Sequence, residues 1–243
     1  MITAVEATEL IKVFGNIKAL DGLNLKINAG EIFGIIGPNG AGKTTCLRVI
    51  STLLLPTSGS VKVFGLDVAA DAAEVRKIIT YLPEEAGAYR NLSGWEYLQF
   101  MASFGARNKE EKRVAVQEAA EICGLGDRLR DKVKTYSKGM KRRLLIARAL
   151  MPKPRLAILD EPTGGLDVLH SYHIRGIIKR YAKDRGATVL LSSHNMLEVE
   201  HLCDRVALVN KGKVVAEGKP VELRDRYGSV NLEDVFAKVV GLA

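Results

Sequence analysis

The sequence predicts an α/β fold in which a mostly parallel sheet follows an antiparallel β layer and is interrupted by a helical subdomain. Three observations lead to this prediction. Short, largely apolar runs such as 31–36 and 188–193 alternate with helical patterns, which favours parallel strands joined by right-handed crossovers. The first 30 residues include runs that alternate apolar with polar side chains, as expected of a sheet with one buried face. Residues 88–151 show helix-start signals but no clear strand pattern.

These segments form one predicted domain of 243 residues. We assign the β layer and the sheet core to 1–87 and 152–218, the helical subdomain to 88–151, and a C-terminal tail helix to 219–243. A composition of 47% hydrophobic and 26% charged residues is ordinary for a globular chain. No apolar run approaches the roughly 18 residues of a membrane span, and the first residues lack signal-peptide features, so we expect a soluble, cytosolic protein.

The N-terminal layer contains an alternating run in which Leu23, Leu25 and Ile27 would face the core, followed by a turn at 28–30. Upstream, Phe14 begins a turn between two β-like runs. An exposed ring there could offer a face to a flat ligand, although a phenylalanine without further context is more often part of the core.

The loop after the 31–36 strand fits the pattern G-x-x-x-x-G-K-[ST]. Glycines allow backbone N–H groups to turn toward phosphate oxygens, the lysine adds a positive charge, and the first threonine hydroxyl can reach Mg²⁺. A predicted helix from Lys43 to about Thr52 adds an N-terminus that favours an anion. We therefore predict nucleotide phosphate binding by a phosphate loop made of Gly37, Pro38, Asn39, Gly40, Ala41, Gly42, Lys43, Thr44 and Thr45.

The helical subdomain contains three predicted helix starts, at Ser93, Asn108 and Ser137. The last of them lies in the segment 136–140, where a serine is followed by a lysine and a glycine. An ordinary N-cap needs no ligand, but a capped, basic helix N-terminus can also bind an anion. These residues alone leave both interpretations open.

Two acids close the apolar run at 156–159, and a histidine closes the following strand. Asp160 and Glu161 would lie at the carboxyl end of the sheet, where α/β proteins bind ligands. Beside a phosphate loop, Asp160 could hold Mg²⁺ and Glu161 could polarise an attacking water. His194, at the same sheet edge, could reach a terminal phosphate. The alternative for Asp160 and Glu161 is that they are surface acids that cap the next helix.

The net charge of +8 would suit nucleic acid, an anionic membrane face or an acidic partner. The basic residues are densest at 138–148 and lack interleaved aromatic residues, so a solvated basic face explains them equally well. The three cysteines are far apart and have no C-x-x-C spacing, which argues against a disulfide framework or a zinc site: Cys46, Cys123 and Cys203.

The order of these motifs resembles the ATP-binding subunit of ABC transporters across nearly the whole chain. In that family a five-residue signature lies between the phosphate loop and the acidic strand, and here it corresponds to 136–140. The resemblance implies a RecA-like P-loop NTPase fold and an enzyme that binds ATP and hydrolyses it with Mg²⁺.

The resemblance also implies roles for single residues. Lys43 would bind the β- and γ-phosphates, while Thr44 and Asp160 would serve Mg²⁺. Glu161 would act on the hydrolytic water, and His194 would sense the γ-phosphate. These roles come from the family and not from the spacing.

In the family, two subunits enclose two ATP molecules, so each site is divided between two chains. Phe14 would stack on adenine and Asp167 would lie at the dimer junction. ATP would close the pair, hydrolysis would open it, and an integral membrane permease would receive the motion at the inner face of the cell membrane. The second subunit, an identical copy or a paralogue, would meet the nucleotide through the signature residues Ser137, Lys138, Gly139 and Met140.

The chain departs from the family pattern at three places. Glu84 stands where a glutamine usually contacts Mg²⁺ or water; a carboxylate is a stronger Mg²⁺ ligand but adds negative charge beside a triphosphate. Lys138 and Met140 replace glycine and glutamine in the signature, and we expect Lys138 to face solvent rather than phosphate. Phe14 replaces a tyrosine and retains the ring.

The runs 81–85 and 231–236, together with the Lys-Gly-Met form of the signature, are similar to the exporter-type branch that includes drug-resistance and sodium-extrusion ATPases. A soluble ABC-type ATPase acting on nucleic acid or the ribosome is the alternative that the positive charge favours. Such relatives usually carry two cassettes, a long coiled coil or zinc motifs, so no nucleic-acid partner is expected. A regulatory module that hydrolyses little ATP is disfavoured because Glu161 and His194 are both present.

Overall fold

The computed structural model describes residues 2–241 and contains two sheets. Its strands are β1 (Thr3–Phe14), β2 (Ile17–Asn28), β3 (Ile32–Ile36), β4 (Ser58–Val63), β5 (Leu66–Asp67), β6 (Ile79–Leu82), β7 (Leu156–Leu159), β8 (Thr188–Ser193), β9 (Arg205–Asn210) and β10 (Lys213–Gly218). The N-terminal sheet has the order β2-β1-β4-β5, and the central sheet has the order β10-β9-β3-β8-β7-β6.

The N-terminal sheet is antiparallel, as its alternating pattern predicts. Strand β1 pairs with both β2 and β4, and Ala7 lies opposite Leu25 on one side and Val61 on the other. All three side chains are buried, because residues directly opposite each other on neighbouring strands point to the same face of the sheet. The polar residues between them, such as Lys26 and Lys62, face outward.

The central sheet is parallel except at one edge. Strand β3 pairs with β8 and β9, and β7 pairs with β6 and β8, all in parallel. Strands β3, β7 and β8 are buried along their whole lengths, which explains their nearly continuous apolar sequences. Strands β9 and β10 form an antiparallel hairpin. The carboxyl ends of β3, β7 and β8 therefore lie side by side along the same end of the central sheet, which is termed the sheet edge.

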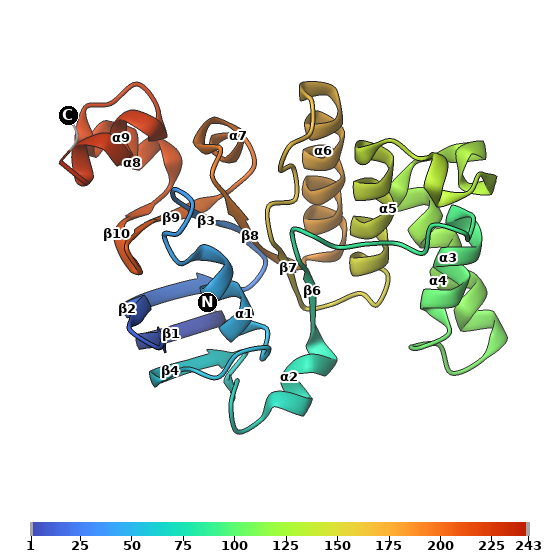
Figure 1. Cartoon of the computed structure of the whole chain (residues 1–243), viewed down its shortest axis with the longest axis horizontal. Helices are drawn as coiled ribbons and strands as arrows, with labels where there is room; N and C mark the ends of the chain where they lie inside the picture. The colour runs from blue at the N-terminus through green and yellow to red at the C-terminus, as the bar shows by residue number, and fades with distance from the viewer. Residues whose placement is uncertain (1, 242–243) are drawn as a thin grey trace.

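The helices are α1 (Lys43–Ile50), α2 (Ala72–Ile78), α3 (Gly94–Ala102), α4 (Lys109–Cys123), α5 (Lys138–Leu150), α6 (Val168–Arg185), α7 (Met196–Glu200), α8 (Pro220–Tyr227) and α9 (Leu232–Val239), with 3-10 turns at Gly126–Arg130 and Val133–Thr135. The predicted caps are present: Ser93, Asn108 and Ser137 each accept a hydrogen bond from a backbone N–H in the first turn of α3, α4 and α5. These three helices gather at one side of the molecule, away from the N-terminal sheet (Figure 1).

The C-terminal tail differs from its prediction, because it contains two helices instead of one. Pro220 occupies the first turn of α8, where a missing N–H costs nothing. Gly228 ends α8 in the left-handed conformation, with a φ of 55°, and Asn231 then caps α9.

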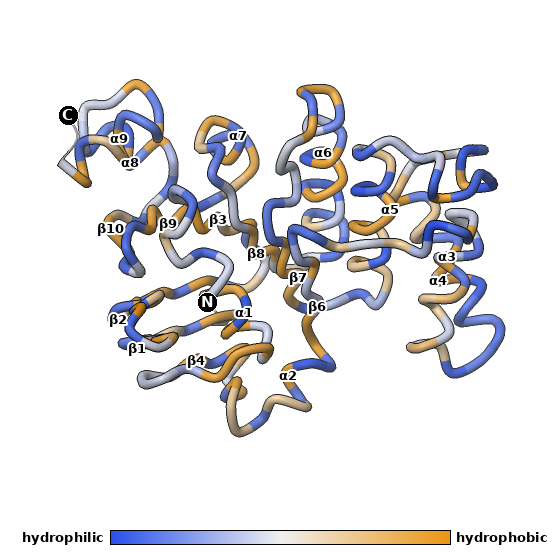
Figure 2. Tube along the Cα trace, viewed as in Figure 1, coloured by the Kyte–Doolittle hydropathy of each residue, from blue (hydrophilic) through white to orange (hydrophobic). Residues whose placement is uncertain are grey.

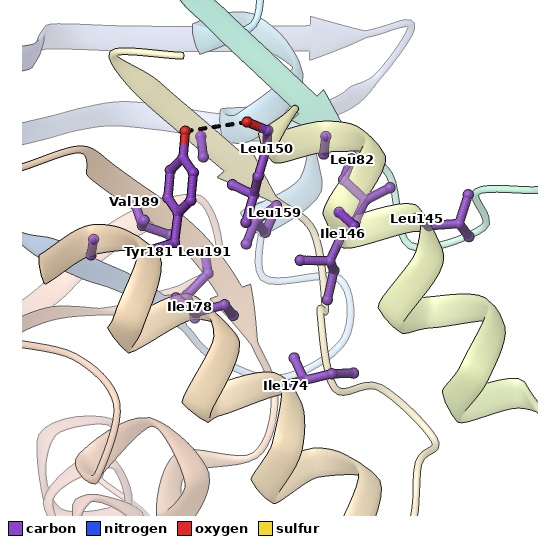
Figure 3. Close-up of a cluster of buried hydrophobic side chains, with 14 of the residues drawn as sticks. Leu82, Leu145, Ile146, Leu150, Leu159, Ile174, Ile178, Tyr181, Val189 and Leu191 are labelled. Carbon is purple, nitrogen blue, oxygen red and sulfur yellow. Dashed lines mark hydrogen bonds between the residues drawn. The ribbon is translucent and has the colours of Figure 1, made fainter. Parts of the chain in front are cut away.

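Helices α5 and α6 pack on the central sheet through the buried apolar cluster in Figure 3. Ile146 and Leu150 of α5 meet Leu159 of β7, and the Tyr181 hydroxyl of α6 donates to the Leu150 carbonyl at 3.3 Å. Hydrophobic residues also follow the strands of both sheets, whereas much of the outer helical region is hydrophilic (Figure 2). Between residues 2 and 241, no helix has the length and apolarity needed to cross a membrane.

Candidate functional site

The phosphate loop joins the end of β3 to the start of α1, as predicted. Gly40 and Gly42 have φ values of 79° and 107°, which side chains rarely tolerate. A Cβ atom on Gly37 would lie 2.1 Å from the carbonyl oxygen of Val209, so the loop backbone passes too close to β9 for any other residue. The loop therefore has the backbone path that its glycine pattern requires.

Lys43 folds back over the loop from the first turn of α1. Its amine donates to the carbonyls of Gly37 at 2.7 Å and Pro38 at 3.2 Å. It also lies 3.6 Å from Oε1 of Glu161. The lysine charge is thus placed between the phosphate loop and the acid that follows β7.

Asp160 is 1% exposed and is held by three hydroxyl groups. Its Oδ1 accepts hydrogen bonds from Thr44 at 3.2 Å and from Ser192 at 2.5 Å. Its Oδ2 accepts one from Tyr81 at 3.1 Å. Burial, together with the negative charge of Asp160, raises the pKa of Tyr81 to about 12, so this hydroxyl remains a donor. Sequence reasoning predicted the pair Thr44 and Asp160 but missed Ser192 and Tyr81.

Glu161 is buried and has an unusual backbone conformation. Its φ of 46° lies in the left-handed region, a conformation that costs a residue other than glycine roughly 1–3 kcal/mol and is typical of functional sites. Its N–H donates to the Ser192 hydroxyl at 2.9 Å. Its Oε2 lies 2.9 Å from Nδ1 of His194, whose side chain is 50% exposed. The fold therefore brings Lys43, Glu161 and His194 together at one sheet edge.

Glu84 and Phe14 are not part of this cluster. Among the contacts of residues 2–241, the Glu84 carboxylate has no hydrogen bond or ion pair with Thr44 or Asp160. Its Oε1 instead faces Gly164, where an added Cβ would lie 3.8 Å away. Phe14 ends β1 with its ring 44% exposed and the Lys12 amine 5.0 Å from the ring centroid. Phe14 is thus partly accessible, as a residue that stacks on a ligand must be.

The signature segment lies at the start of α5 and contacts the loop before α6. The Ser137 hydroxyl accepts from the N–H of Met140 at 3.1 Å, as an ordinary N-cap does. The Lys138 amine lies against Gly165 and occupies the position that a Cβ atom on residue 165 would take. The starts of α5 and α1 lie in different parts of the molecule (Figure 1). One chain therefore does not bring the signature to its own phosphate loop.

Asp167 is the N-cap of α6 and accepts a hydrogen bond from the N–H of His170 at 2.9 Å. The ring of His170 in turn covers Gly139 of the signature. Asp167 thus lies in the loop that the signature contacts, at the exposed start of the helix.

Residues 20–164 match the model of the family described as ABC transporter. This chain belongs to the ABC transporter family. It is 40% identical to the daunorubicin/doxorubicin resistance ATP-binding protein DrrA of Streptomyces peucetius, over 93% of this chain and 68% of that protein. It is also 40% identical to the bacitracin transport ATP-binding protein BcrA of Bacillus licheniformis, over 89% of this chain and 70% of that protein.

Solved structures of ABC proteins share the fold. The structure of an ATP-binding subunit of an ABC transporter superposes with a TM-score of 0.85 and 28% identity, covering 98% of this chain and all of that one. The dimeric ATP-binding cassette MJ0796, in a post-hydrolysis state bound to ADP and Pi, has a TM-score of 0.78 and 29% identity, covering 88% of this chain and 98% of that one.

These comparisons confirm the family and the fold that the motif order predicted. The chain lies in the branch of ABC ATP-binding proteins that contains DrrA and BcrA. It is an ABC ATPase subunit, which hydrolyses ATP to drive transport through a membrane permease.

Proposed function

We propose that this subunit powers the export of antibiotic-like compounds through a separate integral membrane permease, at the inner face of the cell membrane. The cargo class rests on the named cargoes of two relatives, daunorubicin and doxorubicin for DrrA and bacitracin for BcrA. The observation that carries the ATPase site is the convergence of Lys43, Asp160 and Glu161 at one sheet edge.

The working unit in this proposal is a pair of cassettes, either two copies of this chain or this chain with a paralogue. Two features support pairing. The signature is separated from the phosphate loop of its own chain (Figure 1), so a second chain would have to complete each site. Beside Asp167, the exposed apolar side chains of Val168, Leu169 and Tyr172 form a surface that a partner could cover.

In the phosphate loop, backbone N–H groups and the Lys43 amine would hold the β- and γ-phosphates of ATP. Thr44 and Asp160 offer a hydroxyl and a carboxylate oxygen, 3.2 Å apart, which suit Mg²⁺ as a hard cation that prefers oxygen ligands. Mg²⁺, when bound, would neutralise charge on the phosphates. Ser192 and Tyr81 orient the Asp160 carboxylate for this role.

Glu161 would orient and polarise the attacking water. His194 would fix the Glu161 carboxylate through its Nδ1 and would itself contact the γ-phosphate. The signature of the second chain, with Ser137 and Gly139 at the tip of α5, would meet the same phosphate. The attraction between this helix tip and the nucleotide depends on the γ-phosphate. ATP would therefore close the pair of cassettes, and hydrolysis would let the two cassettes separate. In this scheme Phe14 would stack on adenine.

The decisive variant is Glu161→Gln. We expect it to bind ATP normally but to lose hydrolysis by at least about a hundredfold, the scale of general-base loss. With MgATP it should elute as a dimer in gel filtration. Glu233→Gln, an exposed acid in the first turn of α9, is the matched control and should hydrolyse ATP normally. Near-normal turnover by Glu161→Gln would refute the role of Glu161.

The exporter proposal is tested separately in membrane vesicles that contain the permease. ATP-dependent transport of an antibiotic should disappear with Glu161→Gln and persist with Glu233→Gln. Salt-dependent binding of RNA or DNA by the purified chain, with no transport, would favour the nucleic-acid alternative instead.

A further inference from the structure

Arg142 is a buried cation in the second turn of α5 that forms no ion pair within residues 2–241, although its side chain is only 8% exposed. A guanidinium carries five N–H donors, and each one here has its own backbone carbonyl as acceptor. Nε donates to Pro162 at 3.0 Å, Nη1 to Pro83 at 3.1 Å and Glu84 at 3.0 Å, and Nη2 to Asp160 at 2.6 Å and Glu161 at 2.8 Å.

These five carbonyls belong to two segments that carry candidate site residues. One segment follows β6 and contains Glu84, and the other follows β7 and contains Asp160 and Glu161. Arg142 itself comes from the helix that begins with the signature. A single side chain therefore connects the signature helix to the backbone of three acids.

The contact with Glu161 bears on its strained backbone. The Glu161 N–H donates to the Ser192 hydroxyl, and the Glu161 carbonyl accepts from Arg142 at 2.8 Å and from the N–H of Gly164 at 3.1 Å. A residue keeps a φ of 46° only where its surroundings fix it. Without Arg142, the Glu161 carbonyl would keep its hydrogen bond from Gly164 but lose its tie to α5, and the carboxylate would be held less firmly beside Lys43.

We propose that Arg142 is a positioning residue for ATP hydrolysis, which ties the orientation of the Glu161 and Glu84 backbones to the position of helix α5. Movement of α5 against the sheet would then pull on both segments at once. This inference rests on the proposed role of Glu161.

The energetics favour a geometric role over a simple gain in stability. Burial lowers the pKa of the Arg142 guanidinium, while the charges of Asp160, Glu84 and Glu161 act in the opposite direction. A buried charge is costly unless every donor is satisfied, and here every donor is. Lysine would keep the charge but has one nitrogen, which cannot reach acceptors on two segments in a planar fork.

Arg143 provides a matched control. It is the next residue of α5 and also donates to backbone carbonyls, those of Cys123 and Gly124, but at the end of α4 and away from the acids. Loss of its hydrogen bonds should affect packing of the helical region without reaching Glu161.

The test compares Arg142→Lys, Arg142→Gln and Arg143→Gln in the full chain, by steady-state ATPase kinetics, ATP binding and thermal unfolding. We expect both Arg142 variants to bind MgATP within about threefold of the parent while kcat falls at least tenfold, since a misplacement of about 1 Å can cost about a hundredfold. Arg143→Gln should lower the melting temperature but keep kcat within about threefold. An unchanged kcat in Arg142→Lys, or equal losses of kcat in the Arg142 and Arg143 variants, would overturn the proposal.

A double variant separates this inference from the proposed function. If Arg142 acts through Glu161, adding Arg142→Lys to Glu161→Gln should reduce the residual turnover by less than about twofold. A further tenfold loss would contradict action through Glu161. Normal turnover by Glu161→Gln alone would refute the proposed function, whereas an inactive Glu161→Gln with a fully active Arg142→Lys would refute only the inference.

Discussion

A methyl group added at Gly139 would collide with the ring of His170. An ideally placed Cβ would lie 2.1 Å from Cδ2, 2.3 Å from Cγ and 2.7 Å from Nε2 of that ring. Carbon atoms normally approach no closer than about 3.5 Å, so the new methyl group would be about 1.4 Å too close. Gly139 belongs to the start of α5 and His170 to the start of α6. Either the ring must leave its place, or the two helix starts must separate.

Separation of the helix starts would move the signature relative to Asp167. A shift of about 1 Å in a positioned group can reduce turnover by about a hundredfold, so we expect Gly139→Ala to lower kcat by roughly that factor. The free energy of unfolding should fall by only about 1–3 kcal/mol, the usual cost of overpacking. The loss of activity should thus exceed what partial unfolding would cause.

Steady-state ATPase assays of Gly139→Ala, His170→Ala and the double variant test this explanation. His170→Ala removes the obstructing ring, and alone it should keep kcat within about threefold of the parent. The double variant should have a kcat at least about tenfold higher than that of Gly139→Ala. A double variant as inactive as Gly139→Ala would refute the reasoning. The glycine would then be required by something other than the ring, such as close approach of the second subunit's nucleotide.

Two further predictions concern stability. Ser192→Ala leaves the buried N–H of Glu161 without its acceptor, so we expect the free energy of unfolding in urea titrations to fall by about 1–3 kcal/mol; a loss below about 0.5 kcal/mol would contradict this. Burial raises the pKa of Tyr136 and of Tyr181 to about 12, above the ordinary value of 10.0. Above pH 10 the unfolded chain loses tyrosine protons that the folded chain retains, so stability, unaffected below that pH, should fall between about pH 10 and 12. Tyr136→Phe should weaken this dependence, and urea titrations that give constant stability from pH 9 to about 11.5 would refute it.

The parts of the fold that the sequence predicts best depend on short stretches of chain. The glycines of the phosphate loop and the caps at Ser93 and Asn108 each act on the backbone within a few residues. Such local effects can be derived from neighbouring residues alone. Even the additional helix α8 in the tail, which was not predicted, has a local signal, since Pro220 and Gly228 mark its two ends.

The supporting residues of the site are different, because their roles depend on strand order. Tyr81, Asp160 and Ser192 lie on or directly after β6, β7 and β8, and they meet only because these strands are neighbours in the sheet. No motif marks a tyrosine or a serine for that place. Arg142 was likewise one member of a basic cluster, and only the packing of α5 on the sheet separates it from its less buried neighbours.

The arrangement around Lys43 explains how the site can bury two adjacent acids and still receive a triphosphate. Asp160 is stabilised by three neutral hydroxyl donors, so it needs no cation of its own. Lys43 is held mainly by two carbonyl oxygens, and its 3.6 Å distance from Glu161 is longer than the 2.7–2.9 Å of a strong charged hydrogen bond. Most of the lysine charge is therefore left for an incoming phosphate. A close Lys43–Glu161 pair would have both weakened phosphate binding and occupied the carboxylate that the water needs.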